Sequence, residues 1–200
     1  MAKKLLVIDS CVRREESRTK QMLDAALETF KERHPDWETE ILNLMELDLD
    51  YWRTDTLKAR DALLEKKDYD DPIFRYAHQF HDADGIVVAA PFWDLSIPAV
   101  LKVYVENISV DGITFDCNAE GMYGLCRGKW MLFLTTRGGI WAGSDMEQGS
   151  TYMEALCRFF GVKEYHCIYA DGIDIQELDG KAILEKAIRD TRSLCESLTL

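Results

Sequence analysis

The sequence lacks several features that define other classes of protein. No apolar run approaches the length of about 18 residues that a membrane-spanning helix needs. The apolar run near the start of the chain is too short for a signal peptide and is interrupted by Asp9. The six cysteines include no Cys-x-x-Cys pair. We therefore expect a cytoplasmic protein whose cysteines are free thiols, most of them filling the core.

Other absences narrow the possible functions. The net charge of −12 leaves no basic excess, so we expect no binding to nucleic acid or to a membrane surface. No G-x-G-x-x-G follows the first apolar segment and no G-x-S-x-G occurs, which argues against a Rossmann dinucleotide site and a hydrolase nucleophile. His78 and His81 lie three residues apart, but such a pair on an exposed helix is usually solvated, so no metal site is expected.

What is present indicates an α/β protein. With 47% hydrophobic residues in a chain of 200, we expect residues 1–200 to form a single domain. Residues 5–8 and 86–90 are apolar without alternation, which is typical of central strands covered on both faces of a parallel sheet. Residues 39–44 mix glutamates with apolar side chains and predict an edge strand. Two later strands are predicted at residues 130–135 and 164–169.

Helices are predicted between these strands. Met22, Leu23, Ala26 and Phe30 form an apolar stripe at helical spacing, and this helix ends before Pro35. Further helices are predicted around residues 56–66 and over 179–197, whereas residues 111–128 are expected to form a long loop. The remaining helix signals are a start at Asp71-Pro72, a cap at Ser96 with Pro98 in the first turn, and a Thr151-x-x-Glu154 capping box with Gly161 at the helix end.

The alternation of strands and helices predicts a three-layer arrangement with helices on both faces of a five-stranded parallel sheet. Right-handed crossovers and the edge character of the second strand favour the strand order 2-1-3-4-5. In such sheets ligands bind beside the carboxyl ends of the strands. The loops after the first, third and fourth strands therefore converge, and they are the candidate site.

Each of these loops has a ligand-binding interpretation and a structural one. Residues 17–19 offer hydroxyls, a guanidinium and helix N-terminal amides to a phosphate, or Ser17 is only a helix cap. Residues 92–95 form a wall for a flat ring, or they form a loop whose aromatic side chain folds over the core. Residues 136–139 bring main-chain amides close to a ligand, or form a plain turn. The candidates are Ser17, Arg18, Thr19, Pro91, Phe92, Trp93, Asp94, Leu95, Thr136, Arg137, Gly138 and Gly139.

Four motifs together resemble a known family. They are Ser10-Cys11-Val12-Arg13 with Ser17-Arg18-Thr19, Ala90-Pro91-Phe92-Trp93-Asp94-Leu95-Ser96-Ile97-Pro98, Gly112-Ile113-Thr114-Phe115, and Thr136-Arg137-Gly138-Gly139-Ile140. On these motifs the chain resembles the FMN-dependent NADH:quinone oxidoreductases and azoreductases of the flavodoxin-like superfamily, over nearly its whole length.

The resemblance implies a bound FMN and a homodimer with two sites at its interface. Cys11 and residues 17–19 would hold the phosphate, while residues 92–95 and 136–139 would surround the ring. Phe115, Trp141 and Phe159 are expected to line the substrate pocket. The chain departs from the family pattern at Cys11, which replaces a serine, at Trp93-Asp94, which replaces Tyr-Asn, and at Trp141, which replaces a histidine.

The implied reaction is a ping-pong transfer of electrons from NAD(P)H to quinones, azo compounds or other flat aromatic acceptors. The flavin carries this chemistry, so no protein side chain is expected to act as a catalytic acid, base or nucleophile. Two alternatives remain. The acidic charge suits a flavodoxin-type electron carrier that docks on basic partners. A flavin-free signalling domain of the same topology would need an acidic cluster after the first strand, where only Asp9 stands.

Overall fold

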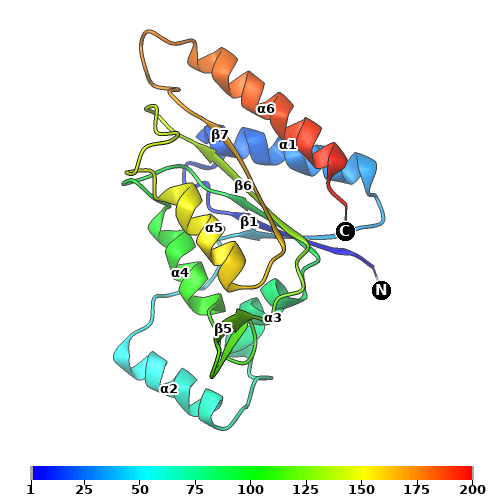
Figure 1. Ribbon diagram of the computed structural model, residues 1–200, viewed down its shortest axis with the longest axis vertical. Coiled ribbons are helices and arrows are strands. Elements are labelled where there is room, and N and C mark those ends of the chain that lie inside the picture. Colours follow the sequence, from blue (N-terminus) through cyan, green and yellow to red (C-terminus); the bar gives the residue numbers. More distant parts are fainter. Residues whose placement is uncertain (1, 200) are drawn as a thin grey trace.

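A parallel sheet forms the centre of the computed structural model, which describes residues 2–199 (Figure 1). Its strand order is β2-β1-β3-β6-β7, so the predicted order is confirmed, with β6 and β7 as the fourth and fifth strands. The strands are β1 (Lys4–Asp9), β2 (Glu38–Asn43), β3 (Gly85–Ala89), β6 (Trp130–Thr136) and β7 (Glu164–Ala170).

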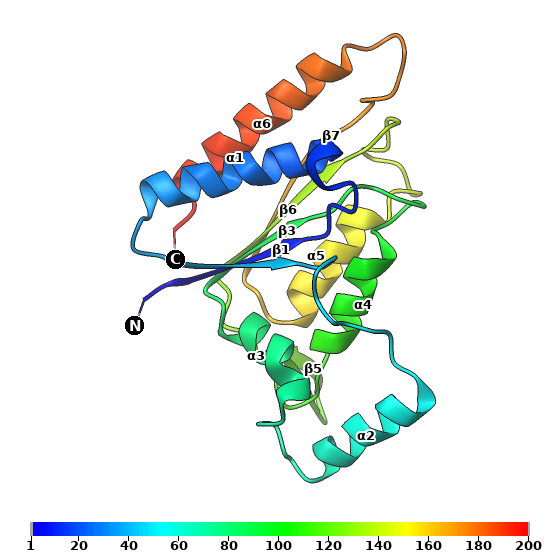
Figure 2. The ribbon, with the colours of Figure 1, turned by 180° about the vertical axis from the view of Figure 1, so that it is seen from behind.

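Helices cover both faces of this sheet, as the sequence predicts. Figures 1 and 2 show α1 and α6 on one face and α3, α4 and α5 on the other. Alternate residues of the central strands supply the two cores: Leu5 and Val7 pack with α1 and α6, whereas Leu6 and Ile8 pack with α3, α4 and α5. The helices are α1 (Arg18–Arg33), α3 (Arg75–Asp82), α4 (Ala99–Ile108), α5 (Gly149–Phe159) and α6 (Gly180–Ser197).

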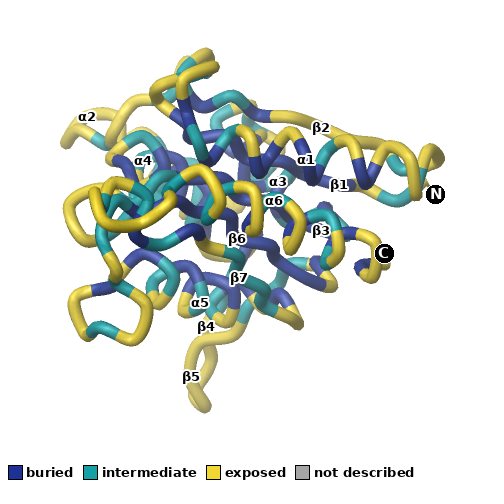
Figure 3. Tube along the Cα trace, turned by 90° about the horizontal axis from the view of Figure 1, so that it is seen from above, coloured by how far each residue is buried: buried dark blue, intermediate teal, exposed yellow. Residues whose placement is uncertain are grey.

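Burial follows strand position. Every residue of β3 and β6 is buried, and so are five of the six residues of β1. The edge strands β2 and β7 are largely exposed or half-buried (Figure 3). The unalternating apolar segments of the sequence are therefore the inner strands, as strands covered on both faces must be.

Two helix starts differ from the predictions. Ser96 does not cap α4, because residues 93–96 form a tight turn in which Trp93 and Ser96 exchange main-chain hydrogen bonds of 3.2 and 2.8 Å. The Thr151–Glu154 capping box is also absent, because α5 begins earlier, at Gly149. There the side chain of Glu147 accepts a 2.9 Å hydrogen bond from the amide of Ser150. Gly161, with a φ of +80°, does end α5 as predicted.

The predicted long loop of residues 111–128 contains an antiparallel hairpin, so that prediction is wrong. Its strands are β4 (Phe115–Asn118) and β5 (Gly121–Gly124). No Asn-Gly or Asp-Gly turn marks the hairpin in the sequence, since its two-residue connection is Ala119-Glu120. Neither strand has a buried residue, so the apolar alternation that would reveal a strand is missing.

Helix α2 (Thr54–Glu65) confirms the helix predicted near residues 56–66, and it has no buried residue. It extends away from the sheet (Figures 1 and 2). Arg60 of α2 donates to the Ser109 carbonyl after α4 at 2.8 Å, and in the segment before α2 the Trp52 indole donates to the Glu106 carbonyl at 3.3 Å. A helix with so little burial has little tertiary stabilisation of its own.

The cysteines are free thiols, as expected. Cys11, Cys157 and Cys195 are buried, whereas Cys117 is exposed. Burial raises the pKa of Cys195 to about 12 and that of Cys157 to about 11, so these thiols stay protonated and unreactive near neutral pH. Within residues 2–199, no helix has the length and apolar character required to cross a membrane.

Gly124 lies where the hairpin meets the end of α5. A Cβ atom at this position would overlap the main chain of Phe160 and Gly161, whereas a Cβ atom at Gly143 would have open space. We expect Gly124→Ala to lower the free energy of unfolding by about 2 kcal/mol, because main-chain atoms must shift. Gly143→Ala is the control and strains only a φ of +79°, at a cost of about 1 kcal/mol. Urea denaturation measures the free energy of unfolding of both variants. A larger loss of stability in Gly143→Ala would contradict the close approach of Gly124 to the main chain of Phe160 and Gly161.

Candidate functional site

The loops at the carboxyl edge of the sheet are bonded to one another. The Ser10 amide donates to the Ala89 carbonyl at 3.0 Å, and the Phe92 amide donates to the Thr136 carbonyl at 3.1 Å. The Arg137 amide in turn donates to the Ala170 carbonyl at 2.8 Å. The loops after β1, β3 and β6 therefore meet as predicted, and the loop after β7 joins them.

These loops border a cleft of about 230 Å³. Eight of the predicted site residues line it, together with Arg13, which belongs to one of the family motifs, and with Glu16 and Asp174, which the sequence analysis did not single out. The predicted residues in the lining are Ser17, Arg18, Pro91, Phe92, Trp93, Thr136, Arg137 and Gly138. A smaller groove of about 170 Å³ lies between Lys4, Glu38 and His78, at the amino ends of β1 and β2. Because ligands of parallel sheets bind at the carboxyl ends, the first cleft is the candidate site.

The first loop presents a helix N-terminus to the cleft. Ser17 caps α1 by accepting a 3.3 Å hydrogen bond from the Lys20 amide, which matches the structural interpretation of this serine. The first amides of a helix have no partner within it, so those of Arg18 and Thr19 remain available to an anion. The Thr19 hydroxyl is buried and lies 2.7 Å from the Thr136 hydroxyl, so it connects two loops.

The second loop makes a reversed turn that exposes an indole ring. Asp94 and Leu95 have φ values of +48° and +68°, as the centre of a type I′ turn requires. This turn leaves Trp93 37% exposed at the cleft. Phe92 instead turns toward the third loop, with its ring centre 5.6 Å from that of Trp141. Trp93 is therefore the ring that a flat ligand could contact.

The third loop is held by Arg137, which is 2% exposed. Its guanidinium lies 3.3 Å from a carboxylate oxygen of Glu147 and 3.4 Å from one of Asp171. The guanidinium carbon also lies 4.6 Å from the ring centre of Tyr169 and 5.7 Å from that of Phe92. Arg137 thus connects the end of β6, the start of α5 and the loop after β7, and its side chain is a structural anchor.

The loop after β7 contributes two carboxylates that the sequence analysis missed. Asp171 accepts hydrogen bonds from the amides of Trp141 and Ala142 at 2.9 and 2.7 Å. Asp174 accepts two hydrogen bonds from Arg18, at 2.7 and 3.2 Å. An aspartate after the last strand was a signal available in the sequence, because that strand also ends at the edge where ligands bind.

The two glycines of the third loop allow close packing by neighbouring side chains. A Cβ atom at Gly138 would lie 2.6 Å from a carboxylate oxygen of Asp174, and one at Gly139 would lie 2.9 Å from the indole nitrogen of Trp141. Within residues 2–199 the amides of both glycines have no hydrogen-bond partner. The glycines therefore admit these side chains and still leave two donors free.

Five predicted cofactor-binding residues do not line the cleft. Cys11 is buried beneath the first loop, where its amide donates to Asp9 at 2.9 Å, and burial raises the pKa of its thiol. Thr19 is buried beside Thr136. Of the others, Asp94 and Gly139 adjoin residues of the lining in the chain, and Leu95 follows Asp94.

The three aromatic residues predicted to line the substrate pocket do not lie together. Trp141 stands beside Phe92 in the third loop. Phe115 and Phe159 instead pair with each other, with ring centres 4.7 Å apart, and Phe159 borders a different groove beside Trp52. One chain therefore does not bring all three aromatic rings to the same cleft.

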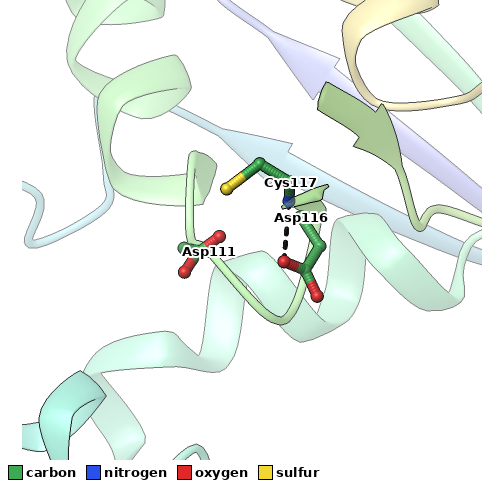
Figure 4. A group of neighbouring side chains, drawn as sticks. All are labelled: Asp111, Asp116 and Cys117. Carbon is green, nitrogen blue, oxygen red and sulfur yellow. Dashed lines mark hydrogen bonds between the residues drawn. The ribbon is translucent and has the colours of Figure 1, made fainter. Parts of the chain in front are cut away.

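A group of metal-ligand side chains lies at the base of the hairpin, outside the cleft (Figure 4). Ligand atoms of Asp111, Asp116 and Cys117 lie within 4.8 Å of one another, and the Cys117 amide donates to Asp116 at 2.7 Å. Asp111 and Cys117 are exposed. Exposed acidic side chains are commonly solvated without a cation, and we assign this group no function.

Comparison with known proteins agrees with this geometry. Residues 3–194 match the Flavodoxin_2 family, described as having a flavodoxin-like fold. The chain belongs to this family. Among the relatives of this Flavodoxin_2 protein is the FMN-dependent NADH:quinone oxidoreductase 2 of Clostridium perfringens strain 13, which is 34% identical over 96% of this chain and 98% of the relative. The enzyme named FMN-dependent NADH:quinone oxidoreductase in Clostridium beijerinckii is 38% identical over 86% of this chain and 87% of its own.

Solved structures give the same result for the fold. The azoreductase of Bacillus anthracis strain Sterne superposes with a TM-score of 0.85 and 25% identity, over 99% of this chain and 100% of that chain. A B. anthracis FMN-dependent NADH-azoreductase, solved in complex with FMN, has a TM-score of 0.87 and 24% identity over the full length of both chains. The resemblance indicated by the sequence motifs and the predicted flavodoxin-like fold are confirmed.

In this Flavodoxin_2 protein we expect the Arg137 cluster to contribute strongly to stability. Arg137→Met would leave the buried Glu147 and the half-buried Asp171 without their cation, and unpaired buried charges cost about 3 kcal/mol. Arg18→Met is the control, since its partner Asp174 is exposed and such a pair contributes less than about 1 kcal/mol. Urea denaturation of the ligand-free variants measures both losses. Equal losses would contradict the anchoring role of Arg137.

Proposed function

We propose that this protein is an FMN-dependent oxidoreductase that transfers electrons from NAD(P)H to quinones, azo compounds or other flat aromatic acceptors. The observation that carries the proposal is the convergence of the predicted loops on one cleft that joins a cationic, hydroxyl-bearing end to an aromatic wall. The named activities of relatives that match nearly the full chain support it. The curated relatives use NADH by name, which favours NADH as the donor.

The cleft fits the two parts of FMN. Ser17 and the guanidinium of Arg18 stand at the N-terminus of α1, where a phosphate dianion is favoured by free amides and by the helix dipole. At the other part of the cleft the exposed face of Trp93 suits a flat ring. The free amides of Gly138 and Gly139 suit the polar rim of that ring.

When FMN is bound, its ring supplies the two-electron chemistry between the nicotinamide and the acceptor. The chain then acts by placement. The loop of residues 92–95 and the loop of residues 136–139 position the ring from two sides. Arg137, fixed by Glu147 and Asp171, keeps the second of these loops rigid. Such rigidity holds a binding site in its productive geometry without further ordering when the ligand arrives.

We further propose that the active form is a homodimer with the clefts at its interface. Helix α2 has no buried residue, and Leu57 on it is 37% exposed. Trp93, Leu95, Tyr169 and Ile140 add exposed apolar surface around the cleft. A second copy could cover both surfaces and bring its Phe115 and Phe159 toward a cleft that these rings do not reach within one chain.

Two expectations from the sequence complete the proposal. We propose that residues 1–200 act as one domain, which is supported by the packing of α1, α3, α4, α5 and α6 on the two faces of a single sheet. A location in the cytoplasm remains a prediction.

The test of the activity is reconstitution with FMN. We expect the purified protein to bind FMN and show a yellow flavin spectrum, and NADH to bleach that spectrum without oxygen. Steady oxidation of NADH with a quinone, in the absence of any partner protein, is then expected. Bleaching without steady turnover would favour a flavodoxin-type electron carrier, and a failure to bind FMN would overturn the proposal.

The test of the assembly is sedimentation velocity. We expect a mass of about twice the 23.0 kDa of one chain. Leu57→Glu should shift the protein toward the monomer, because a carboxylate would be placed in an apolar contact. Arg189→Glu, at an exposed position of α6, is the control and should leave the dimer intact. A monomeric wild-type protein at high concentration would refute the dimer.

A further inference from the structure

The anion end of the cleft already contains an internal carboxylate. Asp174 receives both terminal guanidinium nitrogens of Arg18, at 2.7 and 3.2 Å, in the two-pronged geometry that guanidinium groups also use with phosphates. Both side chains line the cleft. The carboxylate therefore occupies the guanidinium that the proposed function assigns to the FMN phosphate.

The position of Asp174 is set by its main chain. Its amide donates to the Gly138 carbonyl at 3.0 Å, and the preceding amide of Ile173 donates to the Arg137 carbonyl at 3.2 Å. The absence of a Cβ atom at Gly138 lets the carboxylate lie close to the third loop. The loop after β7 is thus held independently of the Arg18 pair, and breaking that pair requires only side-chain rotation.

Asp174 carries its negative charge throughout the neutral range. The hydrogen bonds from Arg18 hold the pKa of this carboxyl below its usual value, and the charge of Arg13 acts in the same direction. The side chain of Asp174 is 61% exposed and that of Arg18 is 36% exposed. An ion pair with this exposure is weak enough for a dianion to displace.

We propose that Asp174 is an internal competitor for the FMN phosphate: it holds Arg18 while the cleft is free and must release Arg18 when a phosphate-bearing ligand binds. This inference rests on the proposed function. In the exchange no covalent bond changes; Arg18 gives up its contacts with a carboxylate and makes contacts with a phosphate. Asp174 therefore lowers the affinity for FMN and has no such effect on riboflavin, which has the same ring without the phosphate.

The test is a comparison of FMN and riboflavin affinities in Asp174→Asn, measured by quenching of flavin fluorescence on titration of the ligand-free protein. The variant keeps the shape of the side chain and removes its charge. We expect the dissociation constant for FMN to fall about three- to ten-fold, which corresponds to the loss of a weak exposed pair and of repulsion toward the dianion. The constant for riboflavin should change by less than about two-fold.

Two controls separate release of Arg18 from a general change in charge. Glu16→Gln removes the same charge from another exposed residue of the cleft lining, one that makes no ion pair in the described part of the chain. It should tighten FMN binding less than Asp174→Asn does. In an Arg18→Met background, Asp174→Asn should tighten FMN binding less than it does in the wild-type protein, because only the repulsion toward the dianion is removed and the competed partner is gone.

The outcomes distinguish the two proposals. If wild-type protein binds FMN and Asp174→Asn leaves its affinity unchanged or weaker, the competitor role is overturned and the proposed function stands. Equal tightening of FMN and riboflavin, or equal tightening in the Arg18→Met background, also overturns the role. If wild-type protein binds neither flavin, the proposed function fails and this inference fails with it.

Discussion

A guanidinium removed from water holds the carboxyl edge of this sheet together. Arg137 directly follows the carboxyl end of β6, and its side chain is almost fully buried between Glu147 and Asp171. A buried charge of this kind is tolerated only with partners of opposite charge, so the positions of both carboxylates are constrained by it. Glu147 also accepts a hydrogen bond from the Ser150 amide in the first turn of α5, and Asp171 accepts hydrogen bonds from the amides of Trp141 and Ala142. Three segments of the edge therefore depend on one side chain.

The cleft combines this rigid part with an exchangeable one. The Arg137 cluster is buried and surrounded by the rings of Phe92 and Tyr169, so water does not compete for its contacts. The Arg18–Asp174 pair spans the same cleft in contact with solvent. Coulombic attraction is much weaker there, because water screens it. The part of the cleft next to Arg137 is consequently preformed. At the N-terminus of α1, by contrast, the carboxylate that pairs with Arg18 can be replaced by another anion.

Sequence patterns predicted the architecture because its strongest constraint, the burial of the inner strands on both faces, is visible as unbroken apolar segments. A strand covered on both faces must be apolar throughout, as in residues 5–8 and 86–90, and the strand order followed from that. The hairpin of β4 and β5 was missed because no buried face imposes a pattern on it. The two helix starts were predicted wrongly for different reasons. Ser96 lies in a tight turn before α4, and α5 begins with a hydrogen bond from the Ser150 amide to the side chain of Glu147. Neither arrangement follows the residue spacing of a standard helix cap.

The loops that form the candidate site could be predicted from the sequence, but the roles of individual residues within them could not. Topology alone places the loops after the first, third and fourth strands together, and the structure agrees. The roles of Arg137 and Gly138 depended on Asp171 and Asp174, which lie more than 30 residues further along the chain. Sequence spacing carries no information about such pairings. Arg137 therefore looked like a ligand-binding side chain, although its guanidinium is bound by carboxylates of the chain itself.

Local charge, and not the net charge of −12, decides how an anionic ligand is oriented in this cleft. At physiological salt, charges farther away than about 8 Å are largely screened. Arg13, Arg18 and the positive end of α1 are therefore the main positive charges near the first loop, where Glu16 and Asp174 are the nearby carboxylates of the cleft lining. Asp94 follows Trp93 in the turn of the second loop and lies outside the lining of the cleft. This distribution of charge favours the orientation proposed above for a ligand with one charged end and one flat end, with its phosphate at α1 and its ring beside Trp93.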